Sequence, residues 1–432
     1  MRGILGIAAR RFHRSVPLPD LIERLSAHAR SLRAELVAKV LPYWFDTAQD
    51  PRHGGFLLAD DLGGRRVATD KQIVSQARMV WGFSHAHRKG FSDARRSYLT
   101  AATRGYHFLL DRFLDRDRAG YVWKTDRAGR VLDDRKFIYA QAFAIFALVE
   151  YHRASGDRAA IDSAMDLYRA LHTHCRDAVH GGWVEHFTRD WQPILDPSTG
   201  REVEVPGLKS GNTHVHVMEA LTELYEVTRD PGVEAALEEA LQINARHFHP
   251  PEAALSRLHR HADWSEVGGR ERGVLSYGHN VEFAWLMIRA ERILGRAPSW
   301  DHFHGHLEHA LRRGFDHRRG GLYARGVGDR PANQTDKIWW VQAEMLAALS
   351  EGLAHRPDRA YAEALDKLIR FVRRYQADPI DGIWLDTVTA AGRPKATGKA
   401  HNWKANYHDL RAVVKFIELF HPPSGGRGSL AS

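Results

Sequence analysis

The sequence is almost free of cysteine. Cys175 is the only one among 432 residues, so the chain cannot form an internal disulfide. Because structural disulfides are typical of oxidising compartments, their absence favours a reducing one, and we predict a cytoplasmic protein. The residues around Cys175 carry no catalytic thiol signature, and we interpret this side chain as a small buried apolar group.

Long apolar runs are also missing. No stretch approaches the roughly 20 residues that a membrane-spanning helix requires, so we predict no membrane association. Residues 1–15 are basic and contain no acid, but residues 16–20 read Val-Pro-Leu-Pro-Asp where a signal peptide would have its apolar core. We predict a flexible N-terminal arm over residues 1–18, whose targeting role stays open. Residues 422–432 are rich in Pro, Gly and Ser and predict a disordered tail.

Charge of one sign is not concentrated anywhere in the chain. There are 62 lysines and arginines against 53 aspartates and glutamates, a formal net charge of +9 with histidine neutral. An excess of this kind can indicate an anionic partner such as nucleic acid or a phosphorylated sugar. The basic residues are scattered, however, with no long basic run and no nucleic-acid-binding motif. We therefore predict no nucleic-acid partner, and the oligomeric state stays open.

What the sequence does contain is an internal repeat. A glycine followed within three residues by an aromatic residue recurs, and the marked glycines are spaced by 66, 61, 139 and 62 residues. The copies are centred on Gly54, Gly120, Gly181, Gly320 and Gly382. Because 139 is close to two steps, we expect a degenerate copy between residues 255 and 264, which makes six units.

A helix start follows each Gly-aromatic signal, and each start carries a polar or aromatic residue that we expect to point inward. These starts are Gln76 to Arg78, Tyr139 to Phe143, His216 to Leu221, His279 to Leu286, Trp339 to Glu344 and Tyr407 to His408. Amphipathic segments such as 159–172 and 233–247 alternate with segments that are apolar all round, such as 136–146. The pattern predicts one all-α domain over residues 19–421, a closed ring of six helical hairpins with short β-hairpins on one rim.

Three of these helix starts carry a histidine: His216, His279 and His408. Glu282 follows His279 by three residues, so the two side chains can share one face of the first helical turn. A histidine backed by a carboxylate suits acid–base chemistry near neutral pH. Because the helix starts should meet at one mouth of the ring, where such folds usually bind ligands, we predict the functional site there.

Taken in order, the motifs resemble those of the N-acylglucosamine 2-epimerase superfamily, which includes mannose isomerases, cellobiose 2-epimerases and sulfoquinovose isomerases. The match runs from about Pro42 to about Phe420, nearly the whole chain. The motifs are Gly-Gly-Phe at 54–56, Gln-Ala-Arg at 76–78, Asn-x-His-x-His-x-x-Glu at 212–219, Gly-His-Asn-x-Glu at 278–282, Trp-Trp-x-Gln-Ala-Glu at 339–344 and Trp-Lys-x-x-Tyr-His at 403–408. The resemblance implies an (α/α)6 barrel and cofactor-free, metal-independent chemistry at C2 of a small sugar substrate.

The resemblance also implies the roles of individual residues. Arg78 matches the family's substrate arginine, and His216 matches a third histidine of the pocket. His279 and His408 match the catalytic pair, with His408 as the base at C2 and His279 as the acid that opens the sugar ring. The implied substrate-binding residues are Tyr139, Asn212, Glu282, Trp339, Glu344 and Trp403.

These residue types fit the chemistry. Removing the proton beside a sugar carbonyl requires a base near C2, a donor for the carbonyl oxygen and stabilisation of the enediolate charge. Histidine, with an ordinary pKa of about 6.5, suits both proton-transfer roles, and arginine supplies a fixed positive charge. Tryptophan can pack on the apolar face of a sugar ring, and of Trp339 and Trp340 only one should point inward.

The same residues serve two outcomes, so the sequence does not separate an isomerase from an epimerase. A histidine that moves a proton from C2 to C1 gives aldose–ketose isomerisation, whereas two histidines on opposite faces of C2 give epimerisation. We favour mannose–fructose isomerisation because residues 339–346 resemble the mannose isomerases; the alternative is 2-epimerisation of cellobiose or another aldose. An insertion at residues 196–210 could either wall off a small pocket or form a lid over it.

The same residues also allow other functions to be considered, namely metal binding, glycoside hydrolysis and carbohydrate binding. His216/Glu219 and His279/Glu282 could bind metal, although bundle di-metal sites usually run Glu-x-x-His and the sequence has no His-Glu-x-x-His. Glycoside hydrolysis requires two carboxylates, whereas Glu219, Glu282 and Glu344 each follow a histidine or tryptophan and look like supporting groups. A carbohydrate-binding protein would not need three histidines and an arginine on one rim.

One histidine-rich segment is not part of the predicted active site. It holds His302, His304, His306 and His309. It could bind a metal ion adventitiously, but we expect an exposed helical face.

Overall fold

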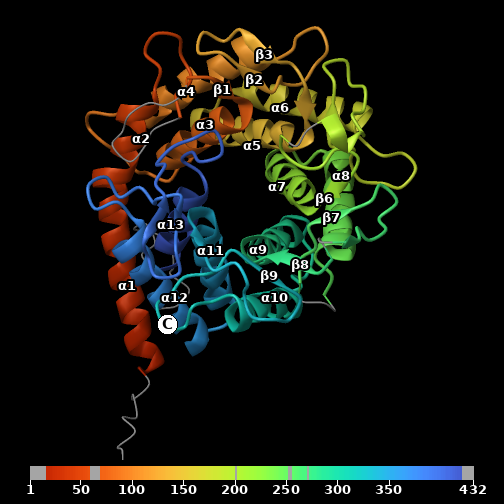
Figure 1. Cartoon of the computed structure of the whole chain (residues 1–432). Helices are drawn as coiled ribbons and strands as arrows, with labels where there is room; N and C mark the ends of the chain where they lie inside the picture. Colours follow the sequence, from red (N-terminus) through yellow and green to blue (C-terminus); the bar gives the residue numbers. More distant parts are fainter. Residues whose placement is uncertain (1–15, 59–68, 200–201, 252–254, 270–271, 421–432) are drawn as a thin grey trace, which may run out of the picture.

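Six helices form the inner wall of a ring (Figure 1). The computed structural model describes residues 16–58, 69–199, 202–251, 255–269 and 272–420. The inner helices are α3 (Ile73–Arg88), α5 (Ile138–Ser155), α7 (Gly211–Thr228), α9 (Tyr277–Ile293), α11 (Trp339–His355) and α13 (His408–Phe420). They are enclosed on nearly every side, and residues 138–151 of α5 are all buried. The all-round apolar pattern of the sequence therefore marks the inner wall.

The outer layer consists of amphipathic helices that bury one stripe against the inner wall. These helices are α4 (Tyr98–Phe108), α6 (Arg158–His174), α8 (Pro231–Ile243), α10 (Trp300–Arg313) and α12 (Arg359–Phe371). Asp157, Asp230 and Asp358 cap α6, α8 and α12 by accepting backbone N–H bonds, which explains the aspartate directly before each of these helices. Several outer helices end in a π-turn: η2 (Leu109–Phe113), η4 (Asn244–Phe248) and η6 (Val372–Gln376).

The two ends of the chain close the ring. The first outer helix runs from α1 (Leu18–Glu35) through η1 (Leu36–Val40) into α2 (Leu41–Ala48). It packs on α12 and on the last inner helix, α13 (Figure 1). The sixth hairpin is therefore assembled from the two ends of the sequence, and the predicted (α/α)6 barrel is confirmed. The predicted arm and tail fall mainly on residues 1–15 and 421–432, which lie outside the described residues.

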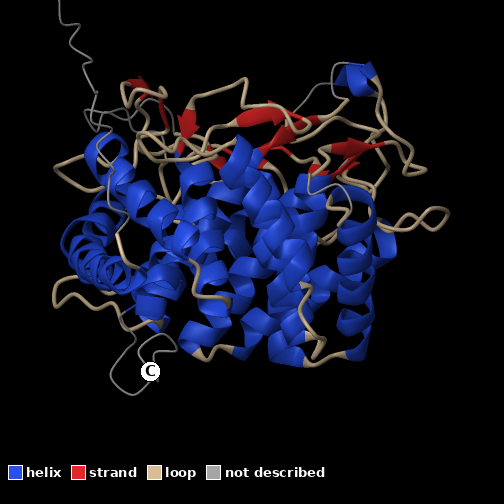
Figure 2. Cartoon of the chain, turned by 90° about the horizontal axis from the view of Figure 1, so that it is seen from below, coloured by secondary structure: helices blue, strands red, loops and turns tan. Residues whose placement is uncertain are grey.

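Short antiparallel strands lie on one rim of the ring (Figure 2). Five inner helices begin directly after a strand: β1 (Lys71–Gln72), β4 (Lys136–Phe137), β6 (Lys209–Ser210), β8 (Val274–Ser276) and β10 (Lys337–Ile338). Their partners are β2 (Lys124–Thr125), β5 (His186–Phe187), β7 (His259–Arg260), β9 (Arg325–Val327) and β11 (Thr387–Val388). β3 (Val131–Asp133) and β12 (Pro394–Ala396) extend two of these pairs, and η3 (Pro197–Thr199) is a 3₁₀ turn.

The Gly-aromatic signals are tight turns on this rim, as predicted. Each is closed by an antiparallel bridge between residues seven apart, of which Gln49–Phe56 and Ala377–Trp384 are the first and last. The glycines carry positive φ angles, such as 79° at Gly54, which explains why glycine recurs there. The degenerate copy is also present, because the N–H of Arg257 donates to the carbonyl of Phe248 at 2.7 Å, the bond that the other units make at the same spacing.

Buried glutamines hold these turns on the inner helices. The side chain of Gln141 accepts from the N–H of Tyr121 and donates to its carbonyl, both at 2.8 Å. Gln76 and Gln342 make the same pair of bonds twenty residues back along the chain. At these helix starts the glutamines therefore clamp the Gly-aromatic turns.

The glutamine clamp gives a stability prediction. Replacing Gln141 by leucine should lower the free energy of unfolding by about 2–4 kcal/mol, because a buried N–H and a buried C=O lose their partners. Urea denaturation followed by circular dichroism measures the change. Gln192→Leu, at an exposed position, is the control and should change stability by less than about 0.5 kcal/mol. Equal stability of the two variants would show that the clamp is dispensable.

The histidine-rich segment of α10 is not an exposed face, so that expectation is wrong. His304, His306 and His309 are only 6, 0 and 2% exposed, and His302 is partly buried. The helix is enclosed from two sides: His306 stacks on His249, whereas His304 bonds to the hydroxyl of Tyr361 on α12. Both ring nitrogens of His304 have polar partners, the hydroxyl of Tyr361 and a ring nitrogen of His355, which allows this histidine to be buried.

Candidate active site

The predicted site residues meet at the mouth of the ring where the inner helices begin. Arg78, Tyr139, His216, His279 and His408 come from α3, α5, α7, α9 and α13, all near the helix N-termini. Because inner helices start on the strand-bearing rim (Figure 2), their first turns, far apart in the sequence, lie around one mouth of the ring. The sequence repeat thus predicts the grouping, and the contacts below define it.

Arg78 is a buried, fixed positive charge. One Nη donates to the carbonyl of Trp403 and the other to the hydroxyl of Tyr139, both at 2.8 Å. The guanidinium also lies over the ring of Phe143, 4.3 Å from its centroid. Burial raises the pKa of Tyr139 to about 12, so this hydroxyl stays neutral and can accept the bond from Arg78.

His216 is oriented by a carboxylate on its own helix. Its Nδ1 lies 2.8 Å from an oxygen of Glu219, one turn further along α7. Its ring packs against Tyr139 and Phe143, with centroids 5.2 and 4.7 Å apart. Burial lowers the pKa of His216, so the ring is neutral near pH 7 and donates Nδ1–H to Glu219.

His408 is held in one tautomer by Glu344. The Nδ1 atom lies 2.6 Å from one carboxylate oxygen of Glu344. The other oxygen of Glu344 accepts from the indole N–H of Trp285 at 3.0 Å. Burial lowers the pKa of His408 to about 3 despite this bond. The neutral ring therefore donates Nδ1–H to Glu344 and keeps the lone pair of Nε2 available as a base.

His279 sits at the edge of the same space and is only partly buried. Its ring centroid lies 4.8 Å from that of Trp340, which in turn lies 5.9 Å from the ring of His408. Desolvation lowers the pKa of His279 to about 4, against the opposing charge of Glu204. The expected His279–Glu282 pair does not form, because Glu282 accepts a bond from Arg411 at 3.1 Å.

Arg411 is the functional residue that the sequence reasoning missed. It donates to Glu219, to Glu282 and, at 2.8 Å, to Glu344, so one guanidinium holds three buried carboxylates. Burial alone would raise the pKa of Glu344, but Arg411 and His408 lower it to about 2. The available signal was an arginine three residues after His408, in the buried first turn of an inner helix.

The position of Arg411 argues against a metal site and against glycoside hydrolysis. Glu282, Glu344 and His408 present ligand atoms within 4.8 Å of one another, a spacing that suits a metal ion. Arg411, however, bonds to both carboxylates, so its guanidinium occupies the place of that cation. The same bonds remove these glutamates from the exposed, paired arrangement that glycoside hydrolysis requires.

The tryptophans and Asn212 take distinct positions. Trp340 contacts both His279 and His408, whereas Trp339 is buried against His401, with ring centroids 5.7 Å apart. Of the adjacent pair, Trp340 is thus the one beside the histidines. Trp403 packs near Tyr139, and Asn212 donates to Glu204 at 3.0 Å.

A cavity of about 380 Å³ opens beside His279 on the strand-bearing rim. Its polar lining includes Glu204, Asn212, Arg325 and Gln334. Glu204 belongs to the insertion at residues 196–210 and accepts from Asn212 while bonding to His259 at 2.8 Å. The described part of this insertion therefore lines the cavity, which has a volume typical of small-molecule sites.

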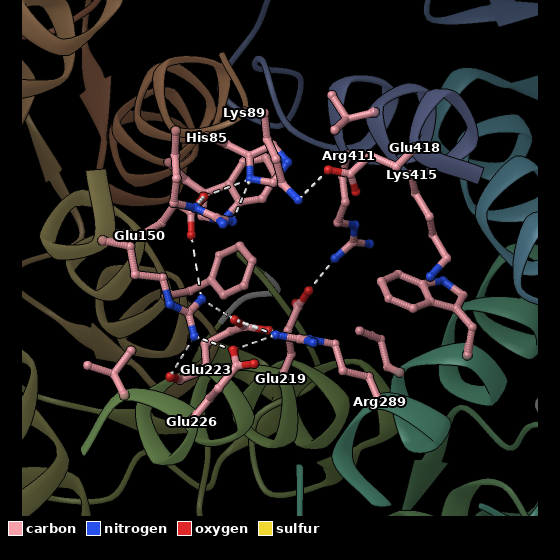
Figure 3. A pocket seen from close by; sticks show the side chains of 18 residues that line it. His85, Lys89, Glu150, Glu219, Glu223, Glu226, Arg289, Arg411, Lys415 and Glu418 are labelled. Carbon is pink, nitrogen blue, oxygen red and sulfur yellow. Dashed lines mark hydrogen bonds and ion pairs between the residues drawn. The ribbon is translucent and has the colours of Figure 1, made fainter. Parts of the chain in front are cut away.

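A second cavity, of about 470 Å³, lies at the opposite mouth, where the inner helices end (Figure 3). Glu219 and Arg411 form part of its wall, so their ion pair belongs to the layer between the two mouths. Its charged groups pair with one another, as Arg289 does with Glu223 at 2.6 Å. His85 is likewise bound to Glu150, at 2.7 Å. We place the site at the rim, where the rings of His279 and His408 both lie beside Trp340.

Comparison with known proteins agrees with this geometry. The family model for N-acylglucosamine 2-epimerase (GlcNAc 2-epimerase) matches residues 54–412, most of the chain. The protein belongs to the N-acylglucosamine 2-epimerase family. The family resemblance found in the sequence is thereby confirmed. None of the described helices of this family member is long and apolar enough to cross a membrane.

The relatives of this N-acylglucosamine 2-epimerase family member are epimerases and isomerases. A cellobiose 2-epimerase of Bacteroides fragilis is 29% identical, over 90% of this chain and 98% of that protein. The structure of cellobiose 2-epimerase from Spirochaeta thermophila is 30% identical, covers 93% of this chain and 98% of its own, and has a TM-score of 0.82. A D-mannose isomerase of Marinomonas mediterranea is 24% identical over 88% of this chain and 95% of that protein. The chain is thus a sugar epimerase or isomerase.

Proposed function

We propose that the protein epimerises C2 of the reducing-end glucose of a disaccharide, with cellobiose as the leading candidate. The observation that carries the proposal is the pair of histidines, His279 and His408, which come from different inner helices and contact one tryptophan. Two neutral histidines around one substrate can exchange a proton at C2 from opposite faces. The cellobiose 2-epimerase relatives favour this alternative over the mannose isomerisation that the sequence favoured.

The proposed reaction begins with ring opening. His279 donates a proton to the ring oxygen and takes up the proton of the C1 hydroxyl, so the open-chain aldehyde forms and His279 keeps a proton. Nε2 of His408 then removes the proton from C2, and the negative charge moves onto the oxygen at C1. Arg78 stabilises this enediolate with its fixed charge. His279 returns its proton to the opposite face of C2, which gives the 2-epimer. The proton held by His408 passes through solvent back to His279, and ring closure by the reverse of the first step completes the cycle.

The supporting residues set the protonation states that these steps require. Glu344 accepts Nδ1–H of His408 and leaves Nε2 unprotonated, as a base must be. Arg411 keeps Glu344 ionised, and Glu219 orients His216 in the same way. The histidines therefore contact the glutamates that orient them, and these glutamates in turn contact Arg411.

Space for a second sugar ring supports a disaccharide substrate. The 380 Å³ cavity is lined by His279 on one helix start and also by Arg325 and Gln334. Its polar groups match the hydroxyls of a sugar, and its position beside His279 suits the ring that does not react. The insertion at 196–210 contributes Glu204 to this lining, which fits an open subsite better than a closed wall.

Product analysis tests the proposal. The full chain is incubated with cellobiose, mannose or glucose in D2O, and products are resolved by chromatography and NMR. We expect the glucosyl-mannose epimer from cellobiose, with deuterium at C2 because the proton passes through exchangeable histidines. Formation of fructose from mannose together with unchanged cellobiose would overturn the substrate assignment in favour of the mannose isomerase alternative.

The histidine environment also predicts the pH dependence. The profile of kcat/KM reports the free enzyme, in which the base must be neutral. Because burial lowers the pKa of His408, the base, to about 3, the acid limb should lie below pH 4. A profile recorded from pH 4 to 8, with folding checked by circular dichroism at each point, provides the measurement. An acid limb near pH 6.5 in folded protein would contradict this assignment.

A further inference from the structure

Three histidines converge outside the site described above. His249 follows η4, and His302 and His306 lie one turn apart on α10. Each offers a ring nitrogen, and these atoms all lie within 4.8 Å of one another. His249 and His306 are fully buried, with ring centroids only 3.3 Å apart, while His302 is partly exposed. The cluster therefore has a buried base and one side that solvent can reach.

One residue, Asn280, fixes the tautomers of the two buried rings. Its backbone carbonyl lies 3.0 Å from Nε2 of His249, and its side-chain oxygen lies 2.8 Å from Nδ1 of His306. The side-chain oxygen is identified because it also accepts the N–H of Ser256, while the amide nitrogen donates to the carbonyl of His306. Both rings therefore donate to Asn280, so Nδ1 of His249 and Nε2 of His306 each keep an acceptor lone pair, and that of His306 faces Nε2 of His302.

These lone pairs point to a ligand. Nδ1 of His249 is buried and has no hydrogen-bond partner among the described residues. Nε2 of His306 lies 3.2 Å from Nε2 of His302. Two nitrogens that each bind zinc at 2.0–2.1 Å with tetrahedral geometry lie about 3.3–3.4 Å apart, close to this value. Histidines whose other N–H is held by a carbonyl or side-chain oxygen are the usual metal ligands of proteins.

We propose that His249, His302 and His306 bind a divalent transition-metal ion, zinc above all, with water as the fourth ligand on the side of His302. Three imidazole donors without a carboxylate suit zinc, nickel or copper and do not suit magnesium or calcium.

The role of the ion is structural. Asn280 directly follows His279 in the first turn of α9, so an ion that fixes both rings also fixes this turn. None of the three ligands belongs to the proposed reaction, and the ion would join η4, α9 and α10 behind the rim. Removing it should lower thermal stability and leave the chemistry at C2 in place.

The test uses the full-length chain, first dialysed against a chelator and then titrated with zinc chloride. Calorimetry should give one zinc ion per chain. At 100-fold excess over Kd, Tm should rise by about 3 °C for a protein of this size. Cobalt(II) should give the visible absorption of a four-coordinate site. His302→Asn should weaken zinc binding at least about tenfold and remove the rise in Tm, whereas the exposed His107→Asn should change neither.

The choice of variant keeps the test decisive. His302 is partly exposed, so His302→Asn should fold even if variants of the two buried histidines do not, and circular dichroism checks this. Zinc binding that is absent, or equally strong in folded His302→Asn, would overturn the proposal. Epimerase activity of the chelated protein is measured separately at 25 °C and should be unchanged. Loss of activity in chelated but folded protein would contradict the structural role, while the metal titration stays independent of the substrate assignment.

Discussion

Replacing His408 by alanine is expected to lower kcat by about 10²–10⁴-fold, the usual contribution of a positioned general base. The fold should persist, because Glu344 retains its bonds to Arg411 and to Trp285 when the imidazole is removed. Initial rates on the substrate identified by product analysis measure the loss, and thermal unfolding monitors the fold.

Isotope exchange separates the roles of the two histidines. His408→Ala should abolish exchange of the C2 hydrogen with D2O, since no base remains at that position. His279→Ala should lose less of its rate with a substrate already in the open-chain form, and His216→Ala should be milder than either. The exposed His107→Ala on α4 is the matched control and should retain full activity. Near-normal turnover by His408→Ala would show that this histidine is structural.

Replacing Arg411 by leucine is expected to lower the free energy of unfolding by at least about 3–5 kcal/mol, because three buried carboxylates lose their shared cation. Burial and the charge of Glu344 already hold the pKa of Glu282 well above its ordinary value, and removing Arg411 should raise the pKa of Glu282 further and also raise that of Glu344. The folded variant then binds more protons than the unfolded chain. The difference in the free energy of unfolding between this variant and the unmodified protein should therefore decrease as the pH falls from 8 to 5.

Urea denaturation at pH 8 and pH 5 measures this effect. Arg359→Leu is the matched control, because Arg359 forms an exposed pair with Glu363 on α12 and should contribute only about 0.3–0.5 kcal/mol at either pH. Arg411→Lys keeps the positive charge, but a lysine ammonium lacks the planar guanidinium that reaches three partners at once. We therefore expect a loss of unfolding free energy between those of Arg411→Leu and Arg359→Leu. A loss below about 1 kcal/mol for Arg411→Leu would show that the carboxylates find other partners.

The repeat made the fold and much of the site predictable. A turn that requires positive φ selects glycine, and a wall buried on every side selects apolar residues, so both leave a local pattern in the sequence. The six helix starts follow from that pattern, and Arg78, His216, His279 and His408 stand at or near those starts. Even the degenerate copy near Leu255 could be inferred from the spacing alone.

Only the tertiary structure decided which side chains meet. Trp339 and Trp340 are indistinguishable by sequence, but adjacent residues diverge around a helix, and the direction of α11 places Trp340 beside the histidines. Arg411 bonds to glutamates that lie 67, 129 and 192 residues away, and no local pattern encodes such partners. His306 is buried because His249 and Asn280 pack on it from other elements. The sequence alone therefore determined the ring and its rim, since those depend on local periodicity, whereas contacts between helices, which depend on packing, decided the pairings inside it.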